Sequence, residues 1–264
     1  MSFPIWLDTE TKALTTYELK LQHVRAGVQG VVQGFHTGLF LWGEPGTGKS
    51  RTVITALEKL EADYVLHNSR LTARGLIDAL KKKRDHVHLI EDAETMFDDK
   101  KTAGVLRSAL SSQSDARPCE RTITWSAYNA TIRFTFRGGI IITSNVNLAD
   151  HPEIQATKTR LCIMNLDPSK MELWALQKKI CQDGFNLGEL RMDREECWDV
   201  AGFLHKERKH LTTHLDTRLL VNGFKDYLQC RSGASCGVSW QDLLLTRMRE
   251  EPFIKPKPPV MATS

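Results

Sequence analysis

The 264-residue sequence has no apolar run that approaches the roughly 20 residues needed to cross a membrane. Its first residues, MSFPIWLDTETK, lack the basic segment, apolar stretch and small-residue cleavage site of a secretion signal. Its six cysteines include no CxxC pair, so their spacing favours neither a metal site nor a disulfide framework. We therefore expect a cytoplasmic protein with reduced thiols and no membrane association.

The amino-acid composition adds little more about the class of protein. Hydrophobic residues make up 41% of the chain and charged residues 26%, which is typical of a folded globular protein rather than a disordered one. A chain of this length forms one or two domains. The net charge of +4 permits nucleic-acid binding without requiring it, because a binding footprint needs basic residues clustered on one face.

The most informative segment is GEPGTGKS at residues 43–50, a complete GxxxxGK[ST] motif that follows the apolar run GLFLW. Glycines let backbone N–H groups turn around phosphate oxygens, and the helix predicted at 51–59 directs its positive end to the same anion. Lys49 would contact the β and γ phosphates of ATP, and Ser50 would ligate Mg²⁺. The alternative is a glycine-rich turn that binds no nucleotide. The predicted nucleotide-binding residues are Gly43, Glu44, Pro45, Gly46, Thr47, Gly48, Lys49, Ser50 and Arg51.

Strand-like and helix-like patterns alternate through about residue 165 and predict a three-layer α/β fold with a parallel sheet. Beyond Pro168, helical periodicity without a convincing strand predicts a small all-α C-terminal lid. Residues 121–125 and 131–136 alternate in polarity around a short connection, which is typical of a β-hairpin. The expected divisions are an N-terminal helical segment at 1–34, an α/β core at 35–166, a helical lid at 167–250 and a Pro- and Lys-rich tail at 251–264.

Two carboxylates follow the apolar run VHLI. An ATPase with a phosphate-binding loop needs a second strand end that presents carboxylates to magnesium and to the attacking water. Glu91 and Asp92 occupy such a position and are predicted to serve as metal ligand and catalytic base, in either assignment. Alone, the pair would be read as solvated residues after a core strand.

Three segments carry a family resemblance: GEPGTGKS at 43–50, HLIED at 88–92 and IIITSN at 140–145. In this order they resemble the AAA+ ATPases, and the resemblance covers most of residues 35–250. It implies a P-loop NTPase core, ATP and Mg²⁺ as ligands, and a homo-oligomer in a ring or open assembly. This sequence departs from the family in one respect, because the family places Asp before Glu. The reversed order suggests altered water positioning and slow, switch-like hydrolysis.

The resemblance implies three further catalytic residues. Asn145 matches sensor 1, which positions the water and senses the γ-phosphate, although asparagine also caps turns. Arg160 matches the arginine finger, which reaches the nucleotide of a neighbouring subunit. Arg218 matches sensor 2, a lid arginine that contacts the phosphates. Arg160 could instead be a surface residue favoured by a helix dipole, and Arg218 could pair with Asp216 or solvent.

Family members use ATP to remodel protein or nucleic acid, and the fold does not decide between them. The segment HNSRLT at 67–72 lacks the aromatic residue of a threading pore loop, which argues against protein unfolding. The predicted hairpin precedes the sensor 1 strand, where helicase-like and initiator-like members contact DNA. It could equally be an ordinary sheet extension, and the basic run KKKR at 81–84 a solvated loop. The candidate DNA contacts in the hairpin region are Arg121, Trp125, Tyr128, Arg133 and Arg137.

These observations favour an ATPase that remodels or loads a partner on DNA, in replication, transposition or another mobile-element process. The alternative is a nucleotide-dependent protein-interaction switch, or chaperone-like adaptor, that recruits a protein partner and binds no DNA. Salt-sensitive retention on DNA separates the two, because phosphate contacts weaken as salt rises.

Overall fold

The chain divides into two compact units in this computed structural model. Unit 1 combines residues 1–14 with residues 170–264, and unit 2 consists of residues 15–169. Helix α1 (Asp8–Val32) begins in unit 1 and ends in unit 2, so the predicted N-terminal segment of residues 1–34 is shared between the units. The structure describes residues 3–68, 71–111, 117–127, 130–147, 152–155, 158–208, 216–235 and 237–249.

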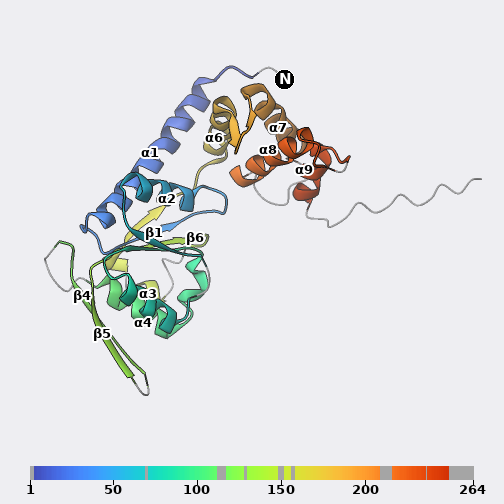
Figure 1. Ribbon diagram of the computed structural model, residues 1–264. Helices are drawn as coiled ribbons and strands as arrows, with labels where there is room; N and C mark the ends of the chain where they lie inside the picture. Colours follow the sequence, from blue (N-terminus) through green and yellow to red (C-terminus); the bar gives the residue numbers. More distant parts are fainter. Residues whose placement is uncertain are drawn as a thin grey trace, which may run out of the picture. The chain divides into compact units, whose positions relative to one another are not determined.

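Unit 2 is built on a five-stranded parallel sheet with the strand order β2-β3-β6-β1-β7. Figure 1 labels its neighbouring strands β1 and β6. Strands β3 and β6 are buried along their whole length, as expected for apolar runs that are covered on both faces of a parallel sheet. The predicted α/β class and parallel sheet are therefore confirmed. The strands are β1 (Gly38–Trp42), β2 (Tyr64–His67), β3 (Val87–Ile90), β6 (Ile140–Ser144) and β7 (Cys162–Asn165).

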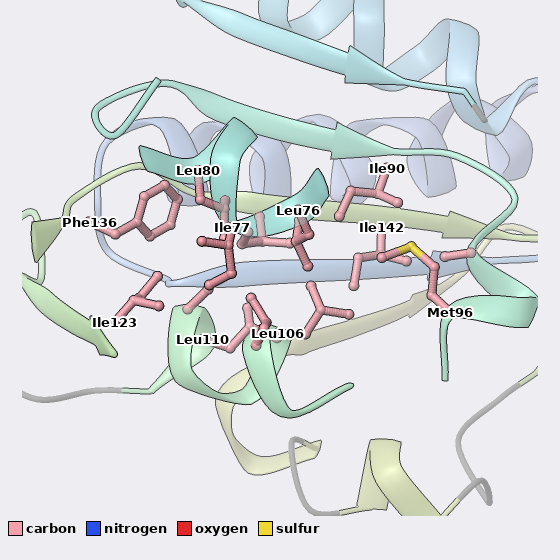
Figure 2. Close-up of a cluster of buried hydrophobic side chains, with 14 of the residues drawn as sticks. Leu76, Ile77, Leu80, Ile90, Met96, Leu106, Leu110, Ile123, Phe136 and Ile142 are labelled. Carbon is pink, nitrogen blue, oxygen red and sulfur yellow. The ribbon is translucent and has the colours of Figure 1, made fainter. Parts of the chain in front are cut away.

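Helices lie on both sides of this sheet (Figure 1). Helices α3 (Ala73–Lys82) and α4 (Lys100–Leu110) bury apolar side chains against one face, beside Ile90 and Ile142 (Figure 2). Helix α2 (Lys49–Lys59) lies with α1 on the other side. The remaining helical elements of unit 2 are η1 (Ala93–Met96), α5 (Pro152–Gln155) and η2 (Lys158–Arg160).

The strand order places the predicted motifs together at the carboxyl end of the sheet. From β1 the chain runs through α2 to the outer strand β2, whereas from β6 it runs to β7 at the opposite end of the sheet. Neighbouring strands β1 and β6 thus send their connections in opposite directions, and open α/β sheets bind ligands outside the carboxyl ends of such strands. The GEPGTGKS loop follows β1, Asn145 follows β6, and Glu91 follows β3.

The predicted hairpin is confirmed. Strands β4 (Arg121–Ala127) and β5 (Ala130–Phe136) form a separate two-stranded antiparallel sheet (Figure 1). Its inner face contributes Ile123, Phe134 and Phe136 to the core that also contains α3 and α4. Successive side chains of a strand point to opposite faces, and those that point away from this core are polar. The exposed residues of the outer face are Thr122, Thr124, Ser126, Thr131 and Arg133.

Besides the start of α1, the described residues of unit 1 form four helices and a second hairpin, so the prediction of an all-α lid was wrong. The strands β8 (Phe185–Leu187) and β9 (Leu190–Met192) have three residues each, which is too short for a detectable alternation of polarity. No helix in the described ranges is long and apolar enough to cross a membrane. The predicted tail at 251–264 lies outside the described residues. The helices are α6 (Lys170–Asp183), α7 (Arg194–Glu207), α8 (Thr217–Arg231) and α9 (Trp240–Arg249).

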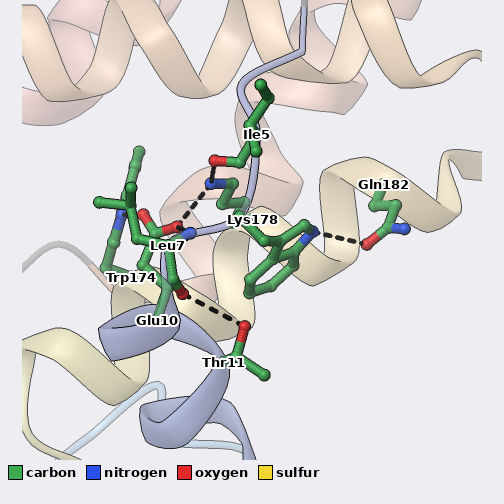
Figure 3. A network of polar contacts seen from close by, with 8 residues as sticks. Ile5, Leu7, Glu10, Thr11, Trp174, Lys178 and Gln182 are labelled. Atoms are coloured by element: carbon green, nitrogen blue, oxygen red, sulfur yellow. Dashed lines mark hydrogen bonds and ion pairs between the residues drawn. The ribbon is translucent and has the colours of Figure 1, made fainter.

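A buried polar network joins the N-terminal residues to α6 within unit 1 (Figure 3). The ammonium of Lys178 lies 2.6 Å from a carboxylate oxygen of Glu10, and the two side chains are only 1% and 7% exposed. Glu10 also accepts hydrogen bonds from Trp174 Nε1 and the backbone N–H of Leu7, each at 2.8 Å. Burial alone would raise the pKa of Glu10, but the hydrogen bonds from Leu7, Lys178 and Trp174 lower it.

Candidate functional site

The loop between β1 and α2 has a backbone that only glycine adopts readily. Gly46 and Gly48 have φ angles of 75° and 83°, in the left-handed region that side chains disfavour. At Gly43 an added Cβ would lie 2.1 Å from the carbonyl oxygen of Leu166, so no side chain fits. The Thr47 hydroxyl donates across the loop to the carbonyl of Glu44 at 2.9 Å. The glycines therefore let the loop close tightly over the end of the sheet.

Lys49 begins α2 and is only 7% exposed. Its ammonium donates to the backbone carbonyls of Gly43 and Glu44, each at 2.8 Å. It also donates to Asn145 Oδ1 at 3.1 Å. A buried ammonium needs such acceptors, because an unpaired charge in the interior is costly. The lysine is therefore held inside the loop and directed toward the end of β6.

Asn145 and Asp92 extend this contact to a third strand. Asn145 Nδ2 donates to Asp92 Oδ1 at 3.0 Å. The orientation of the amide is set by its neighbours, because an ammonium only donates and a carboxylate only accepts. Asp92 has a φ of 49°, and aspartate is one of the few residues that tolerate this left-handed conformation. The chain Lys49–Asn145–Asp92 thus links the carboxyl ends of β1, β6 and β3.

The other members of the predicted site lie close in sequence to this chain. Glu91 is half-buried, and its backbone N–H donates to the carbonyl of His67 at 2.9 Å. Among the described residues its carboxylate forms no hydrogen bond or ion pair. Ser50 and Arg51 follow Lys49 in the first turn of α2, where Ser50 is partly buried and Arg51 is exposed. Asp92, rather than Glu91, is therefore the carboxylate that contacts the asparagine.

Arg160 lies at the amino end of the sheet, opposite to this site. It ends η2, just before β7, and its carbonyl accepts a hydrogen bond at 3.1 Å from Thr37, just before β1. Its exposed guanidinium donates to the carbonyl of Arg107 in α4 at 3.3 Å. The five-residue strand β1, about 16 Å long, separates Arg160 from the GEPGTGKS loop. Arg160 is therefore not part of the site of its own chain.

Arg218 lies in unit 1, as the second residue of α8, and is exposed. The carboxylate of Asp216 caps this helix by accepting a hydrogen bond from the backbone N–H of Leu219 at 2.7 Å. Among the described residues no ion pair joins Arg218 to Asp216. Of the two alternatives for Arg218, the pair with Asp216 is therefore not formed, and its exposure agrees with contact with solvent. Its assignment as sensor 2 stays a prediction.

The prediction that Arg121 contacts DNA was wrong. Arg121 is 2% exposed, lies 4.8 Å above the ring of Phe136 and donates to the carbonyl of Gly138. Burial lowers its pKa. The alternation of the strand explains the error, because residue 121 shares the inner face of β4 with Ile123 and Trp125.

The other hairpin candidates differ in exposure. Arg137 is engaged by Glu120 at 2.7 Å and by Asp85 at 3.3 Å. Trp125 is half-buried, and the guanidinium of Arg74 lies 5.6 Å from its ring. Arg133 is exposed on the outer face of the hairpin. The basic run at 81–84, which begins in the last turn of α3, is also exposed. Tyr128 lies outside the described residues.

Sequence reasoning missed one contact of the loop. Tyr17 of α1 is buried, and its hydroxyl donates to the carbonyl of Thr47 at 2.9 Å. The helical pattern predicts that Tyr17 lies on α1, but two residues that far apart in sequence offer no local signal of contact. The core of unit 2 therefore supports the loop from α1 as well as from the sheet.

Among the described residues, no group of three or more His, Cys, Asp or Glu side chains could hold a metal ion by itself. Mg²⁺ at a phosphate site does not need such a group, because phosphate oxygens and water supply most of its ligands. No protein-family model matches the chain, and no curated protein matches it either. The function must therefore follow from the chemistry of the site.

Proposed function

We propose that the chain is a magnesium-dependent ATPase of the AAA+ type, with a P-loop NTPase core and its nucleotide site at residues 43–50. The observation that carries this proposal is the hydrogen-bonded chain Lys49–Asn145–Asp92. It brings together a phosphate-binding cation, a polar amide and a carboxylate from three separate strand ends, beside a glycine loop that leads into a helix. Phosphoryl transfer requires this combination of positioning groups and charges.

Each residue has a defined task in this proposal. The loop amides and the N-terminus of α2 bind the phosphates of ATP, as helix N-termini bind anions. Lys49 exchanges a loop carbonyl for a phosphate oxygen, because an ammonium has three N–H donors and no acceptor. Asn145 orients the attacking water, and the carboxylate of Glu91 or Asp92 accepts its proton.

The residues present fit Mg²⁺. The ion prefers hard oxygen ligands, and the Ser50 hydroxyl with the carboxylate of Asp92 or Glu91 offers that type of donor beside the loop. When bound, Mg²⁺ neutralises charge on the β and γ phosphates. Either carboxylate can serve as the metal ligand or as the base for the water, and single substitutions of Glu91 and Asp92 distinguish the two assignments.

The position of Arg160 supports a homo-oligomer. Because the length of β1 separates Arg160 from the loop of its own chain, an arginine finger at this position can only act on the nucleotide of a neighbouring subunit. The residue is exposed, as a trans-acting group must be. We therefore propose that hydrolysis depends on assembly into a ring or open oligomer.

The outer face of the hairpin supports DNA as the partner on which the ATPase acts. Its exposed residues are hydroxyl side chains and Arg133, with no carboxylate among them. Hydroxyl and guanidinium groups are the side chains that commonly contact DNA phosphates. The basic run at 81–84 is also exposed. The alternative, a nucleotide-dependent protein switch without DNA binding, predicts that neither group affects turnover.

The test is steady-state ATP hydrolysis by the purified chain, with and without single- and double-stranded DNA. We expect turnover that requires Mg²⁺ and rises with DNA at low salt. Lys49→Ala should abolish it, and Arg160→Ala should abolish turnover while ATP still binds. ATP binding and turnover with no response to DNA would support the protein switch, and the absence of ATP binding would refute the whole proposal.

A second experiment tests the hairpin face directly. Arg133→Ala should weaken DNA binding several-fold and reduce the salt dependence of the affinity, because one phosphate contact is lost. Arg137→Ala is the matched control, since that guanidinium is already engaged by two carboxylates. Equal DNA affinities for Arg133→Ala and the unsubstituted chain would show that the outer face of the hairpin does not contact DNA.

A further inference from the structure

Tyr17 contacts the phosphate-binding loop from outside the motif. It lies on α1 and is 2% exposed, and its hydroxyl donates to the Thr47 carbonyl at 2.9 Å. A Cβ added to Gly48 would lie 3.7 Å from the same hydroxyl, so Tyr17 lies directly beside the peptide that joins these two loop residues. The contact is within unit 2 and belongs to the loop that enters α2.

The geometry of the peptide bond gives this contact a consequence. In a trans peptide, the carbonyl of one residue and the N–H of the next point in opposite directions. Tyr17 holds the Thr47 carbonyl toward α1, so the N–H of Gly48 is directed away from α1. Gly48 has a φ of 83° and no Cβ, so without such a contact the peptide plane between Thr47 and Gly48 would rotate at little cost. The following plane is already held, because the Gly48 carbonyl accepts hydrogen bonds from the backbone N–H and the hydroxyl of Thr52.

We propose that Tyr17 is a positioning residue of the nucleotide site, which fixes the peptide between Thr47 and Gly48 so that the Gly48 N–H faces the phosphates of ATP. This inference rests on the proposed function, because it assigns the loop to phosphate. Tyr17 itself does not touch the ligand. It acts by removing the freedom of one peptide plane, and preorganised donors bind more strongly than mobile ones.

The test is Tyr17→Phe, which removes the hydroxyl and keeps the buried ring. A hydrogen bond to a neutral carbonyl changes affinity by about three- to tenfold, so ATP and inorganic tripolyphosphate should both bind that much more weakly. Adenosine, which has no phosphate, should bind as it does to the unsubstituted chain. Tyr227→Phe is the control, because its hydroxyl donates to Glu196 in unit 1 and has no link to the loop.

A second readout separates positioning from stability. Amide hydrogen exchange at Gly48 should become faster in Tyr17→Phe, while exchange in the buried strand β6 stays as in the unsubstituted chain. A loss of thermal stability with unchanged tripolyphosphate affinity would show a purely structural role and overturn the inference. If the unsubstituted chain binds neither ATP nor tripolyphosphate, the proposed function fails. If it binds both and Tyr17→Phe binds them equally well, the positioning role of Tyr17 alone is wrong.

Discussion

At the scale of single residues, Asn145 is the group on which the proposed chemistry depends, because it contacts both Lys49 and Asp92. We expect Asn145→Ala to lower kcat by about 100-fold, as the loss of a preorganised polar group in an active site does. ATP affinity should change much less, since the loop amides and Lys49 remain. The measurement is kcat at saturating ATP together with the dissociation constant.

The control for this substitution is Asn147→Ala, which removes an exposed amide two residues further along the same loop. Its kcat should stay near that of the unsubstituted chain. A kcat of Asn145→Ala within twofold of normal would show that the asparagine only shapes the turn after β6.

His88 makes stability depend on pH. Its Nε2 donates to the Lys83 carbonyl, which can only accept, and its Nδ1 lies 2.9 Å from Nε2 of His67. Burial disfavours a second proton, so the ring is neutral and Nδ1 accepts from His67. Burial lowers the pKa of His88 to about 4, from 6.5 in an unfolded chain. The unfolded state therefore binds the proton first, and stability falls as pH drops from above 6.5 toward 4. By pH 5 the loss from this group should reach about 2 kcal/mol.

Denaturant unfolding of unit 2 at pH 8 and pH 5 measures this loss. His88→Gln, whose amide can still donate to the Lys83 carbonyl, should flatten the pH dependence by close to one proton. His36→Gln, at an exposed position elsewhere in unit 2, should leave it unchanged. An equal slope for His88→Gln and the unsubstituted chain would rule out His88 as its source.

At the scale of elements, the start of α1 depends on its ion pair with α6. Lys178→Met should destabilise unit 1 by about 3–5 kcal/mol, because it leaves the Glu10 carboxylate buried without a counter-charge. Lys179→Met is the matched control, since Lys179 is exposed and its pair with Asp183 contributes little. Tryptophan fluorescence during urea unfolding reports both. A cost under 1 kcal/mol for Lys178→Met would contradict the role given to the network.

Elements with strong local patterns were predictable and contacts distant in sequence were not. The apolar runs before the GEPGTGKS loop, Glu91 and Asn145 predict three parallel strands, and the structure contains them. The insertion of β6 between β1 and β3 has no local signal, although it makes the contact of Asn145 with Lys49 possible. The hairpin in unit 1 was missed for another reason, because strands of three residues show no detectable alternation of polarity. The burial of Arg121 follows from the alternation of side chains along β4. The prediction of a DNA contact relied instead on the charge of this residue.

At the scale of the whole molecule, mutagenesis can separate the two halves of the proposed trans-acting site. Lys49→Ala lacks the loop lysine but retains Arg160, whereas Arg160→Ala retains the lysine and lacks the proposed arginine finger. Mixing the two inactive variants should restore part of the activity, because some interfaces then combine an intact loop with an intact arginine. Turnover measured against the mixing ratio should pass through a maximum. A mixture as inactive as its components would contradict the assignment of Arg160.

The central claim is that ATP binds at the loop through Lys49. Its most direct test is an equilibrium titration of ATP in Mg²⁺ against the unsubstituted chain, Lys49→Ala and Lys59→Ala. Lys59 is the matched control, an exposed lysine at the other end of α2. We predict saturable binding to the unsubstituted chain and to Lys59→Ala, and a loss of at least tenfold in affinity for Lys49→Ala. No binding to any of the three, or equal binding to all, would contradict the account.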